Sequence, residues 1–373
     1  MDHFVSLDER GLRRRESLFD FLTAIGHQPI VCGLLFCTWV LGMIAGSVWT
    51  RMRTKTIAVH DAMGKWLKRA VETDDVDTVR LLCKKWGSEE SVLNWRADDG
   101  YTPLLVASIQ GFNGVAAELL AQSAIDVNKA DPNGSTALAR SAFNGRMEVL
   151  RQLMAHPHCD LNKVDKFGAS ALLRACQSKK IDCCQLLLAH TSTDATLMDN
   201  KGTSPLLLSC ATGDVTIVDA ILLSKAGRRD INRANEKGVT PLMRCAEAGS
   251  KSHVACIKML LAQPSIDPNR QDSSGRTALH YAAAAGRDLV LNVLLPLLGL
   301  EVNKPPKDGS TALIECCAAG HARCVKLMLA LGAPYIEVRA MRDDGSTALS
   351  VSAAYPEIEA LISSVLRNIE FLD

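Results

Sequence analysis

The pattern of apolar and polar residues changes once along the chain. Residues 30–49 form an uninterrupted run of 20 residues without a charged side chain. At 1.5 Å per residue, a helix of this length spans the ~30 Å hydrocarbon core of a bilayer, so the run predicts one transmembrane helix over residues 29–50. Beyond residue 60, short apolar stretches alternate with glycine-marked turns, which indicates a second and different part of the chain over residues 61–373.

Two other interpretations of residues 30–49 stay open. A cleaved signal peptide would have an arginine-bearing start and small residues near its end, such as Ala45 and Ser47. A buried soluble helix should carry a polar stripe, which this run lacks. We favour a membrane anchor because Trp49 and the basic residues after it are typical of a membrane–water interface.

The charges that flank the run predict its orientation, because lysine and arginine are enriched on the cytosolic side of membrane spans. The basic residues that count are Arg10, Arg13, Arg14 and Arg15 before the run, and Arg51, Arg53, Lys55, Lys65, Lys68 and Arg69 after it. The larger number after the run favours a cytosolic domain over residues 61–373, joined to the membrane by a basic linker over residues 51–60. The membrane itself could be that of the endoplasmic reticulum, the mitochondrial outer membrane or the plasma membrane.

Two smaller features lie near the span. Gly42 and Gly46 have the GxxxG spacing that lets two membrane helices approach closely, which suggests a homodimer contact. The tail over residues 1–28 contains a stretch, residues 12–25, with the apolar spacing of an interfacial helix.

One motif recurs eight times after residue 61. It reads Gly-x-Thr/Ser-Pro/Ala-Leu, and its first glycines, 34 to 37 residues apart, are Gly100, Gly134, Gly168, Gly202, Gly238, Gly275, Gly309 and Gly345. The glycine permits the positive φ of a tight turn, and the hydroxyl two positions later can cap a helix. Proline follows in three units and is favoured in a first helical turn. The motif therefore predicts a turn and a short helix in every unit.

The second half of each unit has its own signature. Eleven residues after the first glycine, six units carry another glycine, which predicts the end of the short helix. An apolar stretch follows, and an acidic-apolar-Asn sequence such as Asp126-Val127-Asn128 closes several units. Each unit should contain a turn, a short helix, a second turn, a longer helix and an extended finger. Stacked units bury a continuous core that one unit cannot bury alone.

This pattern resembles the ankyrin repeat, most clearly in residues 276–286, RTALHYAAAAG. His280 keeps the family's histidine, whereas Lys179 and Pro356 stand where the second glycine is expected. Residues 65–83 are similar to repeat helices without a finger. The resemblance implies an all-α ankyrin-repeat solenoid of about eight helix-turn-helix repeats plus an N-terminal cap. Together with the uncharged run over residues 30–49, the expected fold is this solenoid preceded by one transmembrane helix.

Composition removes several classes of function. Lys and Arg total 42 against 41 Asp and Glu, and this net charge of +1 argues against a polyanion-binding basic domain. Aromatic residues make up 5% of the chain, too few to stack along a nucleic acid. The 13 cysteines are too dilute for a disulfide framework and mostly occupy small apolar positions, so we expect reduced thiols in the core.

No motif for catalysis or cofactor binding is present. The sequence contains no GxGxxG, no phosphate-binding GxxxxGK, no GxSxG and no HExxH. His156, His158 and Cys159 are close in sequence, but no second ligand pair follows at zinc-site spacing. His280 is expected to hydrogen-bond the turn of its own repeat. We therefore expect no enzyme, no metal site and no cofactor.

A protein-binding surface remains. The resemblance implies partner contacts at the finger tips and on the short helices. Arg140, Arg174 and Arg244 occupy one position of three short helices, which suggests a groove for an acidic peptide, although such charges can also merely solvate a surface. The residues expected to contact a partner are Tyr101, Arg140, Phe143, Lys166, Phe167, Arg174, Lys201, Lys237, Arg244, Glu247 and Arg276. Charge reversal of the three arginines should abolish binding and leave thermal stability nearly unchanged.

These features predict a membrane-anchored scaffold that presents an ankyrin-repeat groove to a cytosolic protein. The alternative is a regulatory or inhibitory subunit of a membrane enzyme, which would also contact that enzyme through residues 30–49. Exchange of this run for an unrelated span would distinguish the two, because only a simple tether should survive it.

Overall fold

The computed structural model describes residues 56–331 and 336–370 of the 373-residue chain. The chain divides into two compact units, Met1–Met63 and Gly64–Asp373. In the first unit the described residues, 56–63, are helical. The predicted tail, the predicted span with Gly42 and Gly46, and residues 51–55 lie outside the described residues. Within the described ranges, no helix combines the length and the apolar character needed to cross a membrane.

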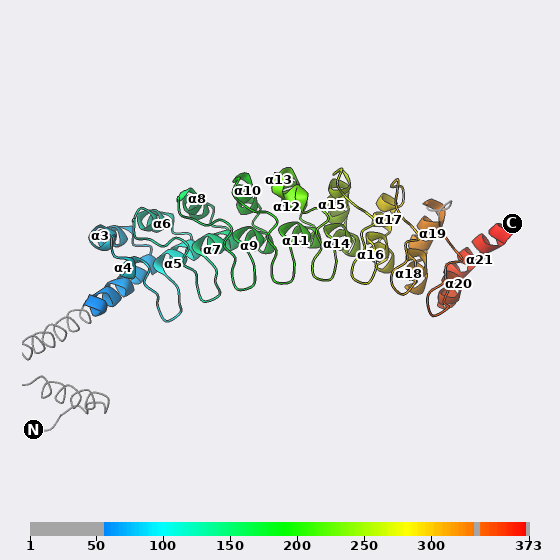
Figure 1. Ribbon diagram of the computed structural model, residues 1–373, viewed down its shortest axis with the longest axis horizontal. Helices are drawn as coiled ribbons and strands as arrows, with labels where there is room; N and C mark the ends of the chain where they lie inside the picture. The colour runs from blue at the N-terminus through cyan, green and yellow to red at the C-terminus, as the bar shows by residue number, and fades with distance from the viewer. Residues whose placement is uncertain (1–55, 332–335, 371–373) are drawn as a thin grey trace, which may run out of the picture. The chain divides into compact units, whose positions relative to one another are not determined.

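The second unit is a stack of helix pairs arranged in two layers (Figure 1). The inner layer consists of the short helices α5 (Pro103–Gln110), α7 (Ala137–Asn144), α9 (Ala171–Gln177), α11 (Pro205–Thr212), α14 (Pro241–Ala248), α16 (Ala278–Ala284), α18 (Ala312–Ala318) and α20 (Ala348–Val351). The outer layer consists of α6 (Asn113–Leu120), α8 (Met147–Ala155), α10 (Ile181–Ala189), α12 (Val215–Leu223), α15 (Lys251–Leu261), α17 (Asp288–Leu294), α19 (Ala322–Leu331) and α21 (Pro356–Glu370). The fingers project from the inner layer, on the side away from the outer helices (Figure 1).

A further helix pair starts the stack. Residues 64–72 are helical, and α3 (Val76–Trp86) follows after a short turn and packs against α6. Leu67 and Val79 are fully buried, so this pair covers the core of the first complete repeat. A one-turn helix, α4 (Glu90–Leu93), leads into the first finger.

The helix caps form as the motif predicts. In the first complete repeat, the Thr102 hydroxyl accepts a hydrogen bond from the Leu105 N–H at 3.3 Å, and Pro103 begins α5. Gly111 ends the helix with φ 84°, in the left-handed region. Lys179, which replaces this glycine in another repeat, adopts φ 53°. The turn geometry therefore persists even where its preferred residue is missing.

The core is continuous through the stack. The leucine of the motif is at most 2% exposed in seven repeats, as Leu104, Leu138, Leu172, Leu206, Leu242, Leu279 and Leu313. All 11 cysteines among the described residues are free thiols, and 10 of them are buried, Cys159 being half-buried. Cys176 and Cys184 approach to 3.7 Å between their sulfur atoms, from an inner and an outer helix of one repeat. The cysteines act as small apolar core residues.

Three repeats are longer than 34 residues, those that begin at Gly202, Gly238 and Gly309, and the first two are longer for a visible reason. In the repeat that begins at Gly202, an extra helix, α13 (Lys225–Arg229), follows α12. In the repeat that begins at Gly238, the outer helix α15 has 11 residues and starts at Lys251. Both insertions lie outside the inner layer, so the inner helices and fingers keep their register.

The glycines at the finger tips allow neighbouring fingers to pack closely. Gly168 has φ 77°, and a Cβ atom there would lie 2.8 Å from the backbone nitrogen of Asn200 in the next finger. Gly345, in the last repeat, has φ 82° and no described heavy atom within 4 Å of such a Cβ. Both glycines permit the positive φ of the turn, but only at Gly168 does the next finger leave no room for a Cβ atom.

Candidate protein-binding surface

Two of the three predicted arginines hold buried carboxylates of their own repeats. Arg140 donates from Nε to Oδ2 of Asp131 at 2.7 Å and forms a second hydrogen bond to the same oxygen. Arg174 does the same with Asp165, its Nε at 2.8 Å from Oδ2. Neither carboxylate side chain has any exposed surface. The two guanidinium groups are thus bound within the protein.

The buried aspartates also organise the finger tips. Oδ1 of Asp131 accepts the N–H groups of Asn133 at 2.8 Å and Ser135 at 3.0 Å. Oδ1 of Asp165 accepts those of Phe167 and Ala169 in the same arrangement. One oxygen therefore folds the turn, and the other oxygen holds the arginine, so each carboxylate joins a finger to the inner helix that follows it.

Arg244, the third predicted arginine, lacks this arrangement. Asn235 stands at the position of the buried aspartate and uses its Oδ1 for the N–H groups of Lys237 and Val239. Arg244 instead pairs with Glu247 on its own helix at 2.9 Å, and the side chains are 35% and 47% exposed. The expectation that reversal of all three arginines leaves stability unchanged is therefore wrong for Arg140 and Arg174, because they neutralise buried charges.

Aromatic rings flank these two arginines. The guanidinium carbon of Arg140 lies 5.9 Å from the ring centre of Tyr101, and that of Arg174 lies 5.6 Å from the ring centre of Phe167. Phe143 and Phe167 remain 40% and 57% exposed. They line a hollow of about 150 Å³, here called the aromatic hollow, with Asn133, Ser135, Ala139, Arg140 and Arg174. The structure thus brings together four of the predicted contact residues: Arg140, Phe143, Phe167 and Arg174.

The predicted finger-tip lysines lie on the surface without carboxylate partners. Lys166, Lys201 and Lys237 are exposed, and none forms an ion pair within the described part of the chain. They occupy three successive fingers, because Lys166 precedes Phe167 and Gly168, and the other two directly precede Gly202 and Gly238. These three side chains supply the uncompensated positive charge that the arginines do not.

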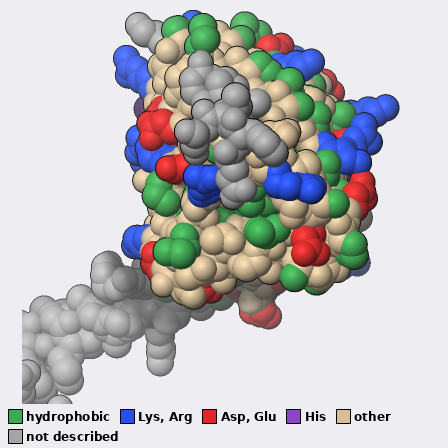
Figure 2. Space-filling view, turned by 90° about the vertical axis from the view of Figure 1, so that its right-hand side faces the viewer, with side chains coloured by type: hydrophobic (Ala, Val, Ile, Leu, Met, Phe, Trp, Pro, Cys, Tyr) green, Lys and Arg blue, Asp and Glu red, His purple; other side chains and the backbone are tan. Residues whose placement is uncertain are grey.

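A second concavity lies further along the stack and was not predicted as a unit. It has a volume of about 710 Å³ and is here called the basic groove, lined by Ser273, Ser274, Arg276, Ala284, Pro306, Lys307, Asp308, Glu315, Ala318, Ala319 and Arg342. Seen from the C-terminal end, basic side chains lie along both sides of the stack, interspersed with acidic ones (Figure 2). The small side chains of Ala284, Ala318 and Ala319 let a ligand approach the inner helices closely.

The charged residues that line the basic groove are one ion pair, two further cations and the carboxylate of Asp308, which leaves a net charge of +1. Arg276 pairs with Glu315 of the next inner helix, and its Nε atom is buried with no hydrogen-bond partner among the described atoms. Burial raises the pKa of Glu315, whereas the Arg276 charge lowers it. Arg342 donates from Nε to the Ser310 hydroxyl at 3.0 Å. Neither Lys307 nor Arg342 forms an ion pair with a described carboxylate, so the groove carries a surplus of positive charge.

The candidate metal residues do not form a site in the described structure. His156 and His158 pack edge to face with ring centres 5.9 Å apart. Burial raises the pKa of the Cys159 thiol to about 12, which disfavours the thiolate that a metal would bind. Across residues 56–331 and 336–370, no group of three or more His, Cys, Asp or Glu side chains is arranged to hold a metal ion.

His280 makes the predicted bond within its own repeat. Its Nδ1 lies 2.9 Å from the Thr277 hydroxyl and accepts the Thr277 N–H at 3.2 Å. Burial lowers its pKa to about 4, and the nearby Arg276 charge acts in the same direction. A neutral histidine with these contacts caps α16.

Comparison with known families identifies the repeating unit. The family model described as "Ankyrin repeats (3 copies)" matches residues 67–165, 138–235 and 222–305, and the model described as "Ankyrin repeat" matches residues 308–339. Together these matches cover more than half of the chain.

Individual relatives are similar over shorter stretches. The human ankyrin repeat domain-containing protein 63 is 36% identical over 101 residues, which is 26% of this chain and 26% of that protein. Human Rabankyrin-5 is 40% identical over 81 residues, 20% of this chain and 7% of its own length. Cortactin-binding protein 2 of Ornithorhynchus anatinus is 47% identical over 53 residues, 14% of this chain and 3% of that protein. The chain thus spans about a quarter or less of the length of these relatives.

Proposed function

Because the chain belongs to the ankyrin repeat family, we propose that it is a protein-binding scaffold whose fingers and inner helices hold an acidic segment of a partner. Ankyrin repeats imply a role in protein–protein interaction. The observation that carries the acidic partner is the set of exposed lysines on three successive fingers, Lys166, Lys201 and Lys237, which have no internal ion pair in the described structure. Opposite charges on a partner would steer and align it along this surface.

The two concavities give this surface its specificity. In the aromatic hollow, the exposed rings of Phe143 and Phe167 offer apolar contact area at low entropic cost. In the basic groove, Lys307 and Arg342 offer cations to a carboxylate. We infer that a partner segment combines acidic residues with at least one apolar side chain.

The membrane component of the proposal rests on the sequence. The uncharged run over residues 30–49 supports an anchor, and the basic residues after it support a cytosolic repeat domain. Protease protection of the intact protein in sealed membranes tests the orientation, since cytosolic repeats should be cleaved without detergent. Resistance of the repeats until detergent is added would contradict it. The homodimer contact through Gly42 and Gly46 stays a prediction for the same segment.

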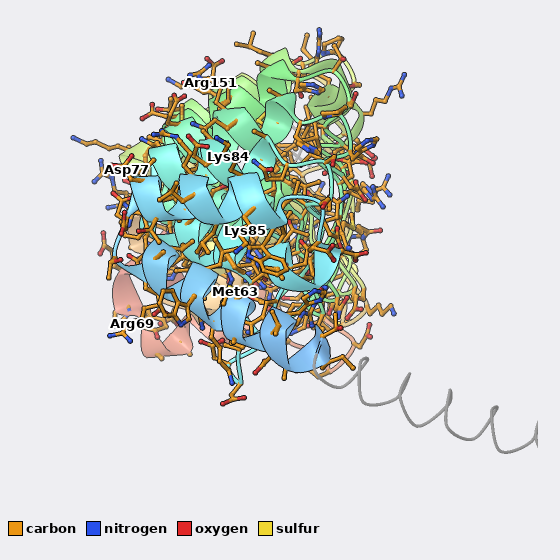
Figure 3. All side chains as sticks on the ribbon, turned by 90° about the vertical axis from the view of Figure 1, so that its left-hand side faces the viewer. Met63, Arg69, Asp77, Lys84, Lys85 and Arg151 are labelled. Carbon is orange, nitrogen blue, oxygen red and sulfur yellow. The ribbon has the colours of Figure 1, made fainter. Side chains whose placement is uncertain are left out.

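Charge reversal tests the binding surface. We expect the triple variant Lys166→Glu, Lys201→Glu and Lys237→Glu of the full-length protein to lose its partners in a proximity-labelling comparison with the wild type. A matched control reverses Lys84, Lys85 and Arg151, which lie on α3 and α8, away from the finger tips (Figure 3). An unchanged set of labelled proteins in the finger variant, or equal losses in both variants, would contradict the proposed surface.

A further inference from the structure

A ladder of asparagine side chains connects successive fingers. In each rung, the asparagine Oδ1 accepts the N–H of the acidic residue that starts the next finger. Where a second bond is present, the asparagine Nδ2 donates to the carbonyl of the residue two positions before that acidic residue. For Asn162, these bonds join Asp194 N–H and Ser192 O, both at 2.8 Å. The rungs are Asn94, Asn128, Asn162, Asn232, Asn269 and Asn303.

The ladder is broken at Thr196, which stands where an asparagine is expected. Its hydroxyl donates back to Oδ1 of Asp194 in its own finger at 2.7 Å. The Asp230 N–H, the partner of the missing rung, bonds to the Gly227 carbonyl of α13 at 3.1 Å. Arg233 supplies a remaining link, from Nη1 to the Thr196 carbonyl at 3.0 Å.

A second set of links is missing at the same place. Elsewhere the finger tips are joined by a backbone hydrogen bond, for example from Asn200 N–H to the Phe167 carbonyl at 2.9 Å and from Ser273 N–H to the Lys237 carbonyl at 3.0 Å. The corresponding bond from Glu236 to Lys201 is absent from the described backbone bonds. Among the described fingers, the tip bond is also absent where Pro132 stands at the donor position, because proline has no N–H. Glu236, in contrast, has an N–H that could donate.

The same contact contains buried polar atoms whose hydrogen bonding is poor. The Asp230 side chain has no exposed surface and lies near the Ser204 hydroxyl and Arg233, but neither of its oxygens forms a well-aligned hydrogen bond with a described group. The Thr193 hydroxyl is also buried and unbonded. Both residues line a hollow of about 450 Å³ with Thr191, Ser192, Asp194, Thr196, Arg229 and Arg233.

The nearest cation compensates the buried charge incompletely. Nε of Arg233 lies 3.7 Å from Oδ1 of Asp230, and Arg233 is half exposed to solvent. Burial raises the pKa of Asp230 to about 6, the Ser204 hydroxyl and Arg233 lower it, and the Asp194 charge raises it. A buried carboxylate with such incomplete compensation weakens the contact it lies in, because opening the contact would hydrate it.

We propose that the contact between the fingers over residues 194–204 and 230–240 is a compliant joint at which the two halves of the repeat stack open locally. The joint combines a missing side-chain rung, a missing tip bond and a buried carboxylate that lacks well-aligned hydrogen bonds. The aromatic hollow lies before the joint and the basic groove after it. If the proposed binding function holds, a partner that contacts both the aromatic hollow and the basic groove must hold the joint in one conformation. The proposal of the joint does not depend on that function.

Amide hydrogen exchange of the full-length protein tests the joint. Backbone amides of residues 194–204 and 230–240 should exchange about tenfold faster than the equivalent amides of residues 160–170 and 267–277, because fewer hydrogen bonds oppose local opening. The variant Thr196→Asn adds the missing rung and should slow exchange at the joint about tenfold. Equal exchange at all four fingers in the wild type would overturn the proposal.

A second variant, which removes a rung instead of adding one, tests the proposal even if Thr196→Asn does not form the new hydrogen bonds. Asn162→Thr removes a normal rung and should create a second fast-exchanging contact between residues 160–170 and 194–204. If Asn162→Thr leaves exchange unchanged, the rungs do not control opening and the proposal fails. If a variant changes the set of labelled partners but not the rate of amide hydrogen exchange, the result concerns the proposed binding surface and not the joint. The two proposals can therefore be tested separately.

Discussion

The guanidinium of Arg140 binds Oδ2 of Asp131, a carboxylate with no exposed surface, nine residues earlier in the same repeat. Replacement by the uncharged Arg140→Met should leave this carboxylate buried without its cation. We expect a loss of about 2 kcal/mol in the free energy of unfolding, measured by urea titration of the full-length protein. Arg244→Met is the matched control and should cost under about 1 kcal/mol, because Glu247 is exposed. Equal losses would contradict the structural role of the pair.

His280 should make the protein sensitive to acid. Its pKa is lowered from 6.5 to about 4 in the folded chain, so the unfolded chain binds a proton first as the pH falls. Stability that is fully present above pH 6.5 should therefore decline toward pH 4, by about 3 kcal/mol from this residue. His280→Leu should remove this component of the pH dependence, since Leu105, Leu173 and Leu207 fill the same position in other repeats. Unfolding curves that remain equally acid-sensitive would refute the assignment.

Asp230 should act with the opposite sign. Its pKa is raised from 3.8 to about 6, so the folded chain keeps its proton longer than the unfolded chain does. The stability contribution is present below pH 3.8 and is lost as the pH rises through 6. Asp230→Asn should match the wild type at pH 4 and exceed it by about 2 kcal/mol at pH 7.

Asp126→Asn provides the comparison for Asp230. Asp126 holds the same place in another finger, is exposed, and accepts the Asn128 N–H at 3.0 Å. Its replacement should bring no gain at pH 7. A gain of equal size from both variants would show that surface charge, rather than burial of the carboxylate, explains the effect.

The core thiols should resist alkylation in the folded protein. Burial raises the pKa of Cys83 to about 11 and that of Cys317 to about 12, so little thiolate exists at pH 8. Iodoacetamide treatment followed by peptide mass spectrometry should leave Cys83 and Cys317 unmodified under native conditions and label them in urea. Rapid native labelling of Cys83 or Cys317 would indicate that these sites are accessible.

A pair of glycines separates turn geometry from packing. Both Gly168→Ala and Gly345→Ala carry the cost of a positive φ, about 1 kcal/mol. Only Gly168→Ala also forces a Cβ to within 2.8 Å of the Asn200 backbone nitrogen. It should therefore be the more destabilising variant, by about a further 1 kcal/mol in urea titrations. Equal costs would mean that the neighbouring finger yields freely.

The local features of the fold were predictable because they depend on residues close in sequence. The Thr102 cap, the Pro103 start and the Gly111 end of α5 follow from one motif, and the same motif places the buried leucines. The broken rung was also visible in the sequence, as Asp194-Ala195-Thr196 in place of an acidic-apolar-Asn segment. Its meaning required the structure, which shows what the asparagines bind.

The candidate site was predicted less completely. Phe143, Phe167 and the tip lysines lie where the resemblance placed them, on the surface of inner helices and fingers. The role of Arg140 was missed because a column of equivalent residues does not reveal that Asp131, nine positions earlier, points at it. The basic groove combines Arg276, Lys307 and Arg342 from three successive repeats, and such a combination appears only when the repeats are stacked.

The open space beside Gly345 has a consequence for how such a chain can lengthen. The other tip glycines face the backbone or side chain of the following finger, whereas Gly345 has no described neighbour within 4 Å. A further finger placed beside Gly345 would meet no described backbone or side chain at that glycine, whereas an extra finger inserted elsewhere would have to separate two fingers that already touch.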